Sequence, residues 1–354
     1  MQDIHFILKK YWGFSSFRPL QQEIIEAVLQ KKDALALMPT GGGKSICFQV
    51  PAMAMEGICL VISPLIALIK DQVETLQRKG INTLAIYSGM HFTEIKKTLQ
   101  NAAYGNYKFL YLSPERLQTQ LFKEFLPAIK PALIVVDEAH CISQWGYDFR
   151  PSYLRIATIR EELPSVPIIA LTASATAKVQ LDICEQLLFS KNYKKFQQSF
   201  ERPNLSYSVF NPTAKQTKLL EIINNTSGSA LVYCKSRKQT QQIAEMLHMH
   251  KLSADFYHAG LSNEERNKKQ EQWIKNKIRI MVCTNAFGMG IDKPDVRVVV
   301  HYDVPDCIEN YYQEAGRAGR DGKRSYAVLL YNYGETDALQ LKAKIKFPAP
   351  EEVK

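Results

Sequence analysis

The amino-acid sequence predicts an α/β protein with two tandem domains, each built on a mainly parallel sheet. Short, nearly continuous apolar runs alternate with segments of helical period, and such runs are typical of strands buried on both faces of a parallel sheet. The alternation is interrupted around 200–212, where Pro203 and Pro212 break the pattern and predict a linker. A length of 354 residues suits two domains of ordinary size.

The first domain is expected over 1–199. Its predicted strands are Asp33 to Met38, Ile58 to Ile62, Thr83 to Tyr87, Phe109 to Leu112, Ala132 to Val136 and Pro167 to Leu171. Segments of helical period between them include Leu20 to Leu29, Leu65 to Arg78 and Ala177 to Leu188.

The second domain is expected over 213–335, after the linker 200–212. Its predicted strands are Ala230 to Tyr233, Ala254 to Tyr257, Arg279 to Val282, Val296 to Tyr302 and Tyr326 to Tyr331. Its predicted helices are Thr240 to His250 and Glu264 to Lys275. Residues 336–354 are expected to form a frayed tail, because Pro348 and Pro350 stand there among acidic neighbours.

Composition narrows the class of protein. Hydrophobic residues make up 46% of the chain and charged residues 23%, which excludes a mainly disordered protein. No apolar run is long enough to span a bilayer, and the N-terminus lacks a secretory signal, so we expect a cytoplasmic protein. Lysine and arginine number 45 against 35 acidic residues, a net charge of +10 that favours a polyanionic partner, although these residues are dispersed. Seven cysteines without a CxxC pair indicate reduced thiols rather than a disulfide framework or a zinc cluster.

A glycine-rich segment, Pro39 to Ser45 (PTGGGKS), follows the first predicted strand and precedes an amphipathic segment. Glycines allow backbone N–H groups to surround phosphate oxygens, and the following helix adds its N-terminal partial positive charge. In such a loop Lys44 contacts the β- and γ-phosphates and the Ser45 hydroxyl ligates Mg²⁺. Met38 stands where the strict pattern has its first glycine, and a plain glycine-rich turn is the alternative. The residues expected to bind nucleotide here are Thr40, Gly41, Gly42, Gly43, Lys44 and Ser45.

Two adjacent acids, Asp137 and Glu138, open the sequence DEAH at the end of a predicted buried strand. Carboxylates at such a place are costly unless a cation or a reaction uses them. We interpret Asp137 as the Mg²⁺ ligand and Glu138 as the group that orients and deprotonates the attacking water. Alone, the four residues could equally be a capped helix start.

Further segments carry a family resemblance. Phe14 with Phe17 to Gln21, the aromatic-rich segment Ala139 to Pro151, and Asn285 to Pro294 accompany PTGGGKS, DEAH and the sequence QEAGRAGR at Gln313 to Arg320. Together they resemble the motifs of helicase superfamily two and, more narrowly, of the RecQ-family DNA helicases, from about Tyr11 to Tyr331. The resemblance implies two RecA-like domains of the P-loop NTPase fold with ATP bound in the cleft between them.

For the nucleotide, the resemblance implies that adenine stacks between Phe14 and Arg18 while Gln21 reads the edge of the base. The family usually has tyrosine at the position of Phe14, which keeps stacking but lacks the hydroxyl; a buried aromatic at a helix entry is the alternative. Asp292 is expected to link the nucleotide or its water with the DNA side.

For DNA, the resemblance implies that the aromatic-rich loop couples contact with a single strand to ATP hydrolysis. Trp145, Tyr147 and Phe149 stand at alternate positions beside Arg150, and aromatic faces stack on any base. An alternating strand with one buried face is the other interpretation, but Gly146 and Pro151 favour a loop.

Arg317 and Arg320 are three residues apart and are expected on one helical face. By resemblance they are arginine fingers that stabilise charge on the transferred γ-phosphate, with Arg320 as the principal one. Two weaker motifs, Ser63 to Gln72 and Ala170 to Thr176, resemble a phosphate-backbone contact and a relay between the ATP and DNA sites.

The predicted activity is that of an ATP-dependent DNA helicase or translocase of 3′-to-5′ polarity, acting in repair, recombination or replication. ATP and Mg²⁺ are the expected cofactors, and zinc is not expected because the zinc and winged-helix modules of the family are not recognised here. The expected partners are single-stranded and forked DNA, with single-strand-binding and other repair proteins; no membrane is expected, and the protein is expected to be a monomer. An RNA helicase of the same superfamily and a non-enzymatic nucleic-acid-binding module are the rival hypotheses.

Overall fold

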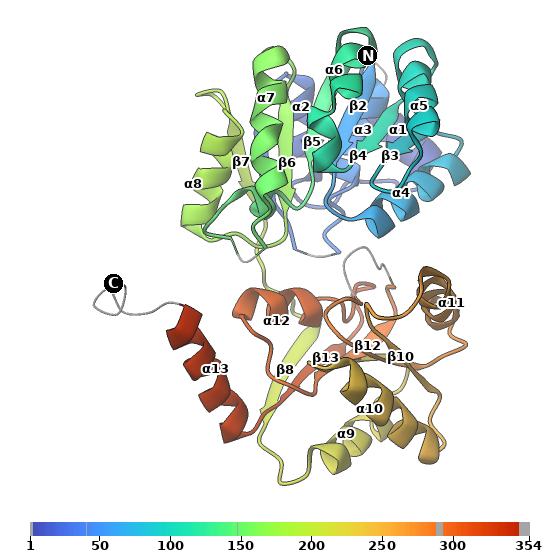
Figure 1. The fold of residues 1–354 in the computed structure, drawn as a ribbon, viewed down its shortest axis with the longest axis vertical. Coiled ribbons are helices and arrows are strands. Elements are labelled where there is room, and N and C mark those ends of the chain that lie inside the picture. Colours follow the sequence, from blue (N-terminus) through green and yellow to red (C-terminus); the bar gives the residue numbers. More distant parts are fainter. Residues whose placement is uncertain (1–2, 40, 147, 288–292, 347–354) are drawn as a thin grey trace. The chain divides into compact units, whose positions relative to one another are not determined.

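The computed structural model describes residues 3–39, 41–146, 148–287 and 293–346. Internal contacts divide the chain into two compact units, Met1–Phe200 and Glu201–Lys354. Each unit is an α/β domain with an entirely parallel sheet, as the sequence predicts (Figure 1). The two units are described separately below.

The first unit contains a seven-stranded sheet of order β3-β4-β2-β5-β6-β1-β7. Its strands are β1 (Ala34–Leu37), β2 (Ile58–Ile62), β3 (Thr83–Ile86), β4 (Phe109–Leu112), β5 (Pro131–Val136), β6 (Ile168–Thr172) and β7 (Lys194–Gln197). Its α-helices are α1 (Ile4–Trp12), α2 (Gln21–Leu29), α3 (Ile46–Ala54), α4 (Ile66–Arg78), α5 (Phe92–Tyr104), α6 (Gln120–Ile129), α7 (Ile156–Glu162) and α8 (Ala177–Gln186). Three short 3₁₀ helices complete it: η1 (Pro114–Gln118), η2 (Ala139–Ile142) and η3 (Pro151–Arg155).

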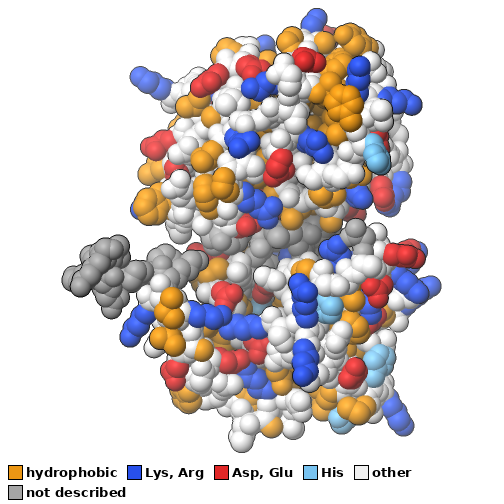
Figure 2. Space-filling view, viewed as in Figure 1, with side chains coloured by type: hydrophobic (Ala, Val, Ile, Leu, Met, Phe, Trp, Pro, Cys, Tyr) orange, Lys and Arg blue, Asp and Glu red, His pale blue; other side chains and the backbone are white. Residues whose placement is uncertain are grey.

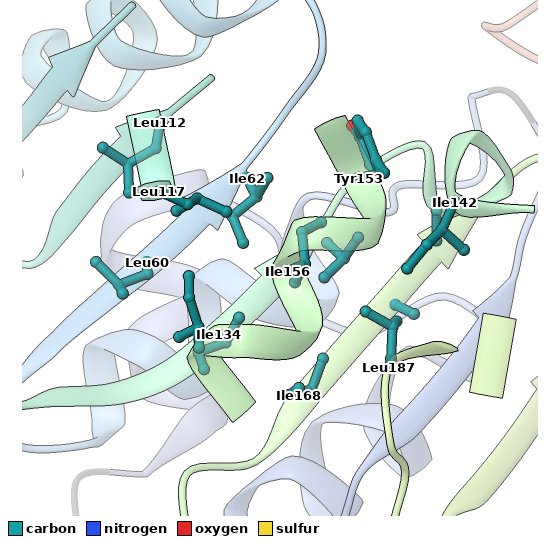
Figure 3. Packing of buried hydrophobic residues seen from close by; sticks show 14 of the residues in the cluster. Leu60, Ile62, Leu112, Leu117, Ile134, Ile142, Tyr153, Ile156, Ile168 and Leu187 are labelled. Carbon is teal, nitrogen blue, oxygen red and sulfur yellow. The ribbon is translucent and has the colours of Figure 1, made fainter. Parts of the chain in front are cut away.

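Both faces of this sheet are covered by helices, and a separate apolar cluster fills each face. Figure 3 shows the packing of one cluster, in which strand residues such as Ile62 and Ile134 lie in the same core as Tyr153 of η3 and Ile142 of η2. The segment that follows DEAH is therefore anchored in the core, and the loops at the carboxyl ends of β1, β2 and β5 are held by buried strands.

The second unit contains a six-stranded sheet of order β10-β11-β9-β12-β13-β8. Its strands are β8 (Leu205–Phe210), β9 (Ser229–Tyr233), β10 (Ala254–Tyr257), β11 (Ile280–Cys283), β12 (Val296–His301) and β13 (Ser325–Leu330). Its helices are α9 (Lys215–Asn224), α10 (Arg237–Met249), α11 (Asn263–Ile274), α12 (Ile308–Ala315) and α13 (Tyr333–Lys346). Serine side chains cap α10 and α11, and α11 has a complete capping box between Ser262 and Glu265.

Every strand predicted from the sequence is present, with ends that differ by no more than one residue. Two other expectations are wrong. Residues 200–212 are not merely a linker, because β8 lies within them and pairs with β13 at the edge of the second sheet. Its alternate side chains, such as Tyr207 and Val209, are exposed, so the segment lacks the apolar run of a central strand. Residues 336–346 belong to α13 rather than to a frayed tail.

Charged side chains of both signs are scattered over the face shown in Figure 2, with no large area of one sign. The basic excess of the sequence is thus dispersed on this face of the molecule. Among the described residues, none of the helices has the length and apolar character needed to cross a bilayer.

Candidate nucleotide site and aromatic-rich loop

The glycine-rich loop connects the buried strand β1 to α3, as the sequence predicts. Gly41 and Gly43 adopt φ values of 82° and 81°, a left-handed conformation that favours glycine. A Cβ atom on Gly43 would also lie 2.4 Å from the side-chain nitrogen of Gln21, so a larger residue would displace that side chain. The loop shape therefore requires these glycines. Thr40 lies outside the described residues.

Gln21, at the start of α2, is buried against this loop. Its Oε1 accepts a hydrogen bond from the backbone N–H of Arg18 at 2.9 Å, and its Nε2 donates to the carbonyl of Gly43 at 3.1 Å. Arg18 donates through Nη1 to the carbonyl of Gly41 at 2.7 Å. Phe14 follows Gly13, the C-cap residue of α1, and its side chain is 50% exposed. Two of the three predicted adenine contacts thus also brace the phosphate loop.

Lys44 and Ser45 stand at the start of α3. The Lys44 ammonium lies 3.4 Å from the carbonyl of Met38, a long hydrogen bond that a stronger anionic partner could replace. Ser45 is the N-cap residue of α3, yet its side chain makes no capping hydrogen bond. Its hydroxyl is therefore not committed to the helix.

Asp137 and Glu138 follow β5, which lies two strands from β1 in the sheet. Burial, reinforced by the neighbouring Glu138 carboxylate, raises the pKa of Asp137, and the Lys44 ammonium opposes this. The backbone fixes Asp137, because its N–H donates to Ile62 at 2.9 Å and its carbonyl accepts from the Tyr153 hydroxyl at 2.9 Å. The Lys44 ammonium therefore does not fully compensate the two adjacent, partly buried carboxylates, and such a pair fits a divalent cation.

Glu138 has φ 48° and ψ 47°, a left-handed conformation that costs a non-glycine residue roughly 1–2 kcal/mol. Its Oε2 atom is buried and accepts no hydrogen bond from the described residues. The same atom lies 3.5 Å from Nδ1 of His140. A strained backbone and an unsatisfied carboxylate oxygen are features of sites where a reacting group is bound.

The ring of His140 lies between the Glu138 carboxylate and the end of β6. Its Nδ1 lies 2.9 Å from the hydroxyl of Thr172, the last residue of β6, and Thr172 in turn contacts the backbone of Ser174. Burial lowers the pKa of His140, so the ring is neutral and exchanges hydrogen bonds rather than charge. Neither His140 nor Thr172 was among the predicted site residues, although both lie in motifs that the sequence analysis quoted.

The aromatic-rich segment is a loop with short 3₁₀ turns, and an alternating strand is excluded for its described residues. Trp145 is 63% exposed, and the ammonium of Lys178 on α8 lies 3.1 Å from the centroid of its ring. A Cβ on Gly146 would lie 2.6 Å from the carbonyl of His140, so the loop packs tightly on DEAH. Tyr147 lies outside the described residues, and Phe149 is half-buried.

Arg150 has a structural position in this loop. It donates to Asp148 through Nε and Nη2, at 3.3 and 3.0 Å, and through Nη1 to the carbonyl of Pro64 at 3.2 Å. Its backbone N–H donates to Cys141 at 2.8 Å. Arg150 therefore ties the aromatic-rich loop to the segment after β2, the weaker predicted phosphate-backbone motif.

That weaker motif has a counterpart that the sequence analysis missed. Ser63 follows β2 and Ser113 follows the adjacent β4, each is succeeded by proline, and each hydroxyl is buried without a hydrogen-bond partner among the described residues. The repeated order of strand, serine and proline is the signal that could have identified Ser113.

In the second unit, Arg317 and Arg320 do not lie on a helix. The helix α12 ends at Ala315, and residues 316–320 form turns. The prediction of one helical face was wrong because α12 stops before Arg317, and Gly319, with a φ of 61°, turns the chain away from the helical path before Arg320. Both arginines line the same small pocket beside Trp273 and Phe287.

The two arginines differ in burial. Arg317 is only 6% exposed and lies against the Tyr233 hydroxyl, whereas Arg320 is partly exposed. Asp292 lies outside the described residues.

Two family models match the sequence. DEAD/DEAH box helicase matches residues 18–183, and the helicase conserved C-terminal domain matches 214–322. In solved structures, the fold resembles the DUF1998 helicase MrfA bound to DNA, with a TM-score of 0.79 over 98% of this chain and 53% of that one, at 17% identity. Both units thus have the helicase fold.

Curated relatives resemble the chain more closely. It is 39% identical to the probable ATP-dependent DNA helicase RecS of Bacillus subtilis, over 100% of this chain and 72% of RecS. It is 42% identical to the ATP-dependent DNA helicase RecQ of Haemophilus influenzae, over 98% of this chain and 55% of that RecQ. The chain therefore belongs to the RecQ family of ATP-dependent DNA helicases.

Proposed function

We propose that the chain is the motor of an ATP-dependent DNA helicase, which hydrolyses Mg-ATP and couples this to 3′-to-5′ movement along single-stranded DNA. The unwinding would serve repair, recombination or replication. The observation that carries the proposal is the continuity of one segment: the acids Asp137 and Glu138 and the exposed Trp145 lie on the same short connection, in which Gly146 packs against the carbonyl of His140. A movement of Trp145 on DNA binding would therefore be transmitted to the acids through Gly146 and His140.

The first unit holds the nucleotide. Backbone N–H groups of the glycine-rich loop and the Lys44 ammonium bind the phosphates, and Phe14 and Arg18 stack on adenine with Gln21 beside them. Two observations support this assignment. The left-handed glycines give the loop its shape, and the long hydrogen bond of Lys44 to the carbonyl of Met38 leaves its ammonium available to a phosphate. By the family resemblance, Asp292 is proposed as a further nucleotide-binding residue.

The Ser45 hydroxyl and Asp137 would hold Mg²⁺, directly or through water, and the ion would supply positive charge beside the phosphates. Glu138 accepts the proton of the attacking water through its unsatisfied Oε2. Its neighbour His140, whose pKa is lowered by burial, stays neutral and lies between that carboxylate and the hydroxyl of Thr172.

Arg320, assisted by Arg317, stabilises the charge that develops on the γ-phosphate. The greater exposure of Arg320 supports its role as the principal finger, since the guanidinium of a finger must be accessible to a phosphate. Trp145, Tyr147 and Phe149 contact bases, while Arg150 supports the loop that presents them.

The test is ATP turnover measured with no nucleic acid and with saturating single-stranded DNA, duplex DNA or RNA. We expect single-stranded DNA to stimulate hydrolysis most. Equal or greater stimulation by RNA would support the RNA helicase instead. Absence of hydrolysis under every condition, together with DNA binding, would support a non-enzymatic binding module.

Translocation is expected to be stronger than duplex unwinding, because no base-reading or strand-separating element was recognised in the sequence. Affinity should come mainly from phosphate contacts, so it should fall steeply with salt and depend little on base sequence. Forked-duplex unwinding and ATPase stimulation, measured on one preparation across a salt series, test this. Efficient unwinding of long duplexes by the chain alone would show that it contains a separating element.

A further inference from the structure

The turn that carries Arg317 and Arg320 is held from outside by two residues that no helicase motif in the sequence analysis included. This turn, residues 316–320, continues from the C-terminus of α12, where backbone carbonyls have no partner within the helix. Such carbonyls need donors from elsewhere, and the structure supplies them from the segment just after the boundary between the units.

Arg202 binds three of these carbonyls. Its Nη2 donates to Ala318 and to Gly319, both at 2.9 Å, and its Nη1 donates to Gly316 at 3.3 Å. Asn204 adds two more hydrogen bonds from Nδ2, to Gly319 at 2.8 Å and to the carbonyl of Lys323 at 3.0 Å. The two side chains also contact each other, because Arg202 Nε lies 3.4 Å from Asn204 Oδ1.

Gly319 is fixed on every side by this arrangement. Its φ is +61°, its N–H donates to Val296 at 2.9 Å, and its carbonyl accepts from both Arg202 and Asn204. A Cβ at this position would lie 2.5 Å from Asn204 Nδ2. The residue directly before Arg320 is thus held in a left-handed conformation by hydrogen bonds at both its N–H and its carbonyl.

The neighbouring elements reinforce this geometry. Asn204 immediately precedes β8, and Tyr207 on β8 lies against Tyr311 on α12, with ring centroids 6.1 Å apart. Figure 1 shows β8 starting beside α12. The start of the second unit and the turn with the arginines form one local assembly.

The chemistry suits a guanidinium better than an ammonium. The C-terminus of a helix carries partial negative charge, and the planar fork of arginine can donate to several carbonyls at fixed angles. Arg202 thus supplies hydrogen-bond donors to carbonyls at and after the end of α12 that have no partner within the helix. The clamp therefore fixes the backbone of the turn that carries Arg317 and Arg320.

We propose that Arg202 and Asn204 are positioning residues that set the catalytic geometry of Arg320 and Arg317, and so connect the segment joining the two units to ATP hydrolysis. This rests on the proposed function, in which those arginines act on the γ-phosphate. Stabilisation of a transition state by charge depends on preorganised donors, and a misplacement of about 1 Å can cost ~10²-fold in rate.

The same unit contains a matched control. Arg279 likewise donates to three backbone carbonyls at and after the end of a helix, namely Ile223 at 2.7 Å, Gly228 at 3.0 Å and Thr226. It is also half-buried, but its acceptors lie in the last turn of α9 and in the connection to β9 rather than in the turn 316–320. Loss of Arg279 therefore reports what losing an arginine clamp does to stability alone.

The experiment compares Arg202→Ala, Arg202→Lys, Asn204→Asp, Arg279→Ala and Arg279→Lys in the full chain. ATP affinity, KM and kcat at saturating single-stranded DNA are measured beside thermal stability. Hydrogen–deuterium exchange of the backbone amides of 316–320 gives a readout that needs no activity.

We expect Arg202→Ala to lower kcat at least ~10-fold with ATP affinity almost unchanged, and to increase exchange in 316–320. Arg202→Lys should recover little, because an ammonium cannot hold three carbonyls in the same geometry. Free guanidinium should partly restore kcat in Arg202→Ala. Both Arg279 variants should lower thermal stability and leave kcat, per folded molecule, unchanged.

Unchanged exchange in 316–320 on removal of Arg202 would overturn the proposal, whatever the ATPase result. So would a kcat for Arg202→Ala within about twofold of the wild type, or an equal loss in Arg279→Ala. If the wild-type chain itself fails to hydrolyse ATP, the proposed function fails, while the exchange comparison still decides whether Arg202 and Asn204 order the turn.

Discussion

The phosphate loop of the first unit and the arginine turn of the second unit are both short glycine-containing segments with cationic side chains, yet they are held in different ways. The phosphate loop lies between a buried strand and a helix, and its braces are Arg18, just before α2, and Gln21, the first residue of α2. The arginine turn depends on Arg202, more than a hundred residues earlier in the chain. The first is a local structure with a nearby support, whereas the second is assembled from distant parts.

This difference fits the role proposed for each loop. In the proposed site the phosphates are bound largely by backbone groups, whose positions are determined by the glycines and by the strand–helix connection. An arginine finger acts through a long side chain, so a small rotation of its backbone moves the charge by several ångströms. The turn that presents it therefore needs an external clamp.

The largest expected effect is on the arginine turn. Arg320→Ala should lower kcat by ~10³–10⁵-fold, because the charge that develops on the γ-phosphate would lose its principal cationic partner. Arg324→Ala, in the exposed segment after the turn, should have little effect, since its guanidinium lies over the ring of Tyr326. Turnover at saturating ATP and DNA measures this effect. Equal rates for Arg320→Ala and wild type would show that Arg320 is not an arginine finger.

For the phosphate-loop side, Glu138→Gln should lower turnover by ~10²–10⁴-fold while ATP binding persists, because the lost role belongs to the transition state. Lys44→Ala should abolish turnover and also weaken nucleotide binding. Nucleotide affinity measured beside hydrolysis separates the two. Glu161→Gln on the exposed side of α7 is the control, and comparable hydrolysis by Glu138→Gln would contradict the assignment.

A smaller effect is expected at the aromatic-rich loop. Trp145→Ala should leave basal hydrolysis and nucleotide affinity nearly intact and weaken the stimulation by DNA, since one base stack contributes ~1–3 kcal/mol. Tyr104→Ala, an even more exposed aromatic residue on α5, should not change the stimulation. If the DNA-stimulated rate is the same in Trp145→Ala, Trp145 has no part in coupling.

The smallest effect concerns Gln21 and decides between two roles. If its amide mainly braces Gly43, Gln21→Ala should raise KM for ATP and GTP alike and cost ~1–3 kcal/mol of stability, the penalty for buried groups left without partners. If it reads adenine, only ATP should be affected. The adjacent Gln22→Ala, whose side chain pairs with Glu26 on the surface, is the control.

The sequence predicted the parts of the molecule that local rules govern. Buried strands, the glycines of the phosphate loop and the acids after β5 follow from apolar runs and from the chemistry of single short segments. What could not be predicted depends on contacts between distant segments. The edge strand β8 lacks an apolar run because one of its faces is exposed, and the clamp of Arg202 on the turn after α12 exists only once the sheet has formed.

Partial errors have the same origin. The spacing of Arg317 and Arg320 predicted a common helical face, but α12 ends at Ala315, before both arginines, and the clamp fixes the turn that follows. Arg150 was predicted as a DNA-coupling residue next to the aromatic side chains, and the sequence did not indicate that its side chain connects Asp148 with Pro64. In each case a charged side chain has backbone partners that the sequence alone does not identify.

The central claim is that ATP hydrolysis drives movement toward the 5′ end of single-stranded DNA. The most direct measurement is the displacement of streptavidin from oligonucleotides biotinylated at either the 5′ or the 3′ end, with Glu138→Gln as the inactive control. The account predicts ATP-dependent displacement from the 5′ end by the wild-type chain, and none by Glu138→Gln. Displacement only from the 3′ end, or ATP hydrolysis without displacement from either end, would contradict it.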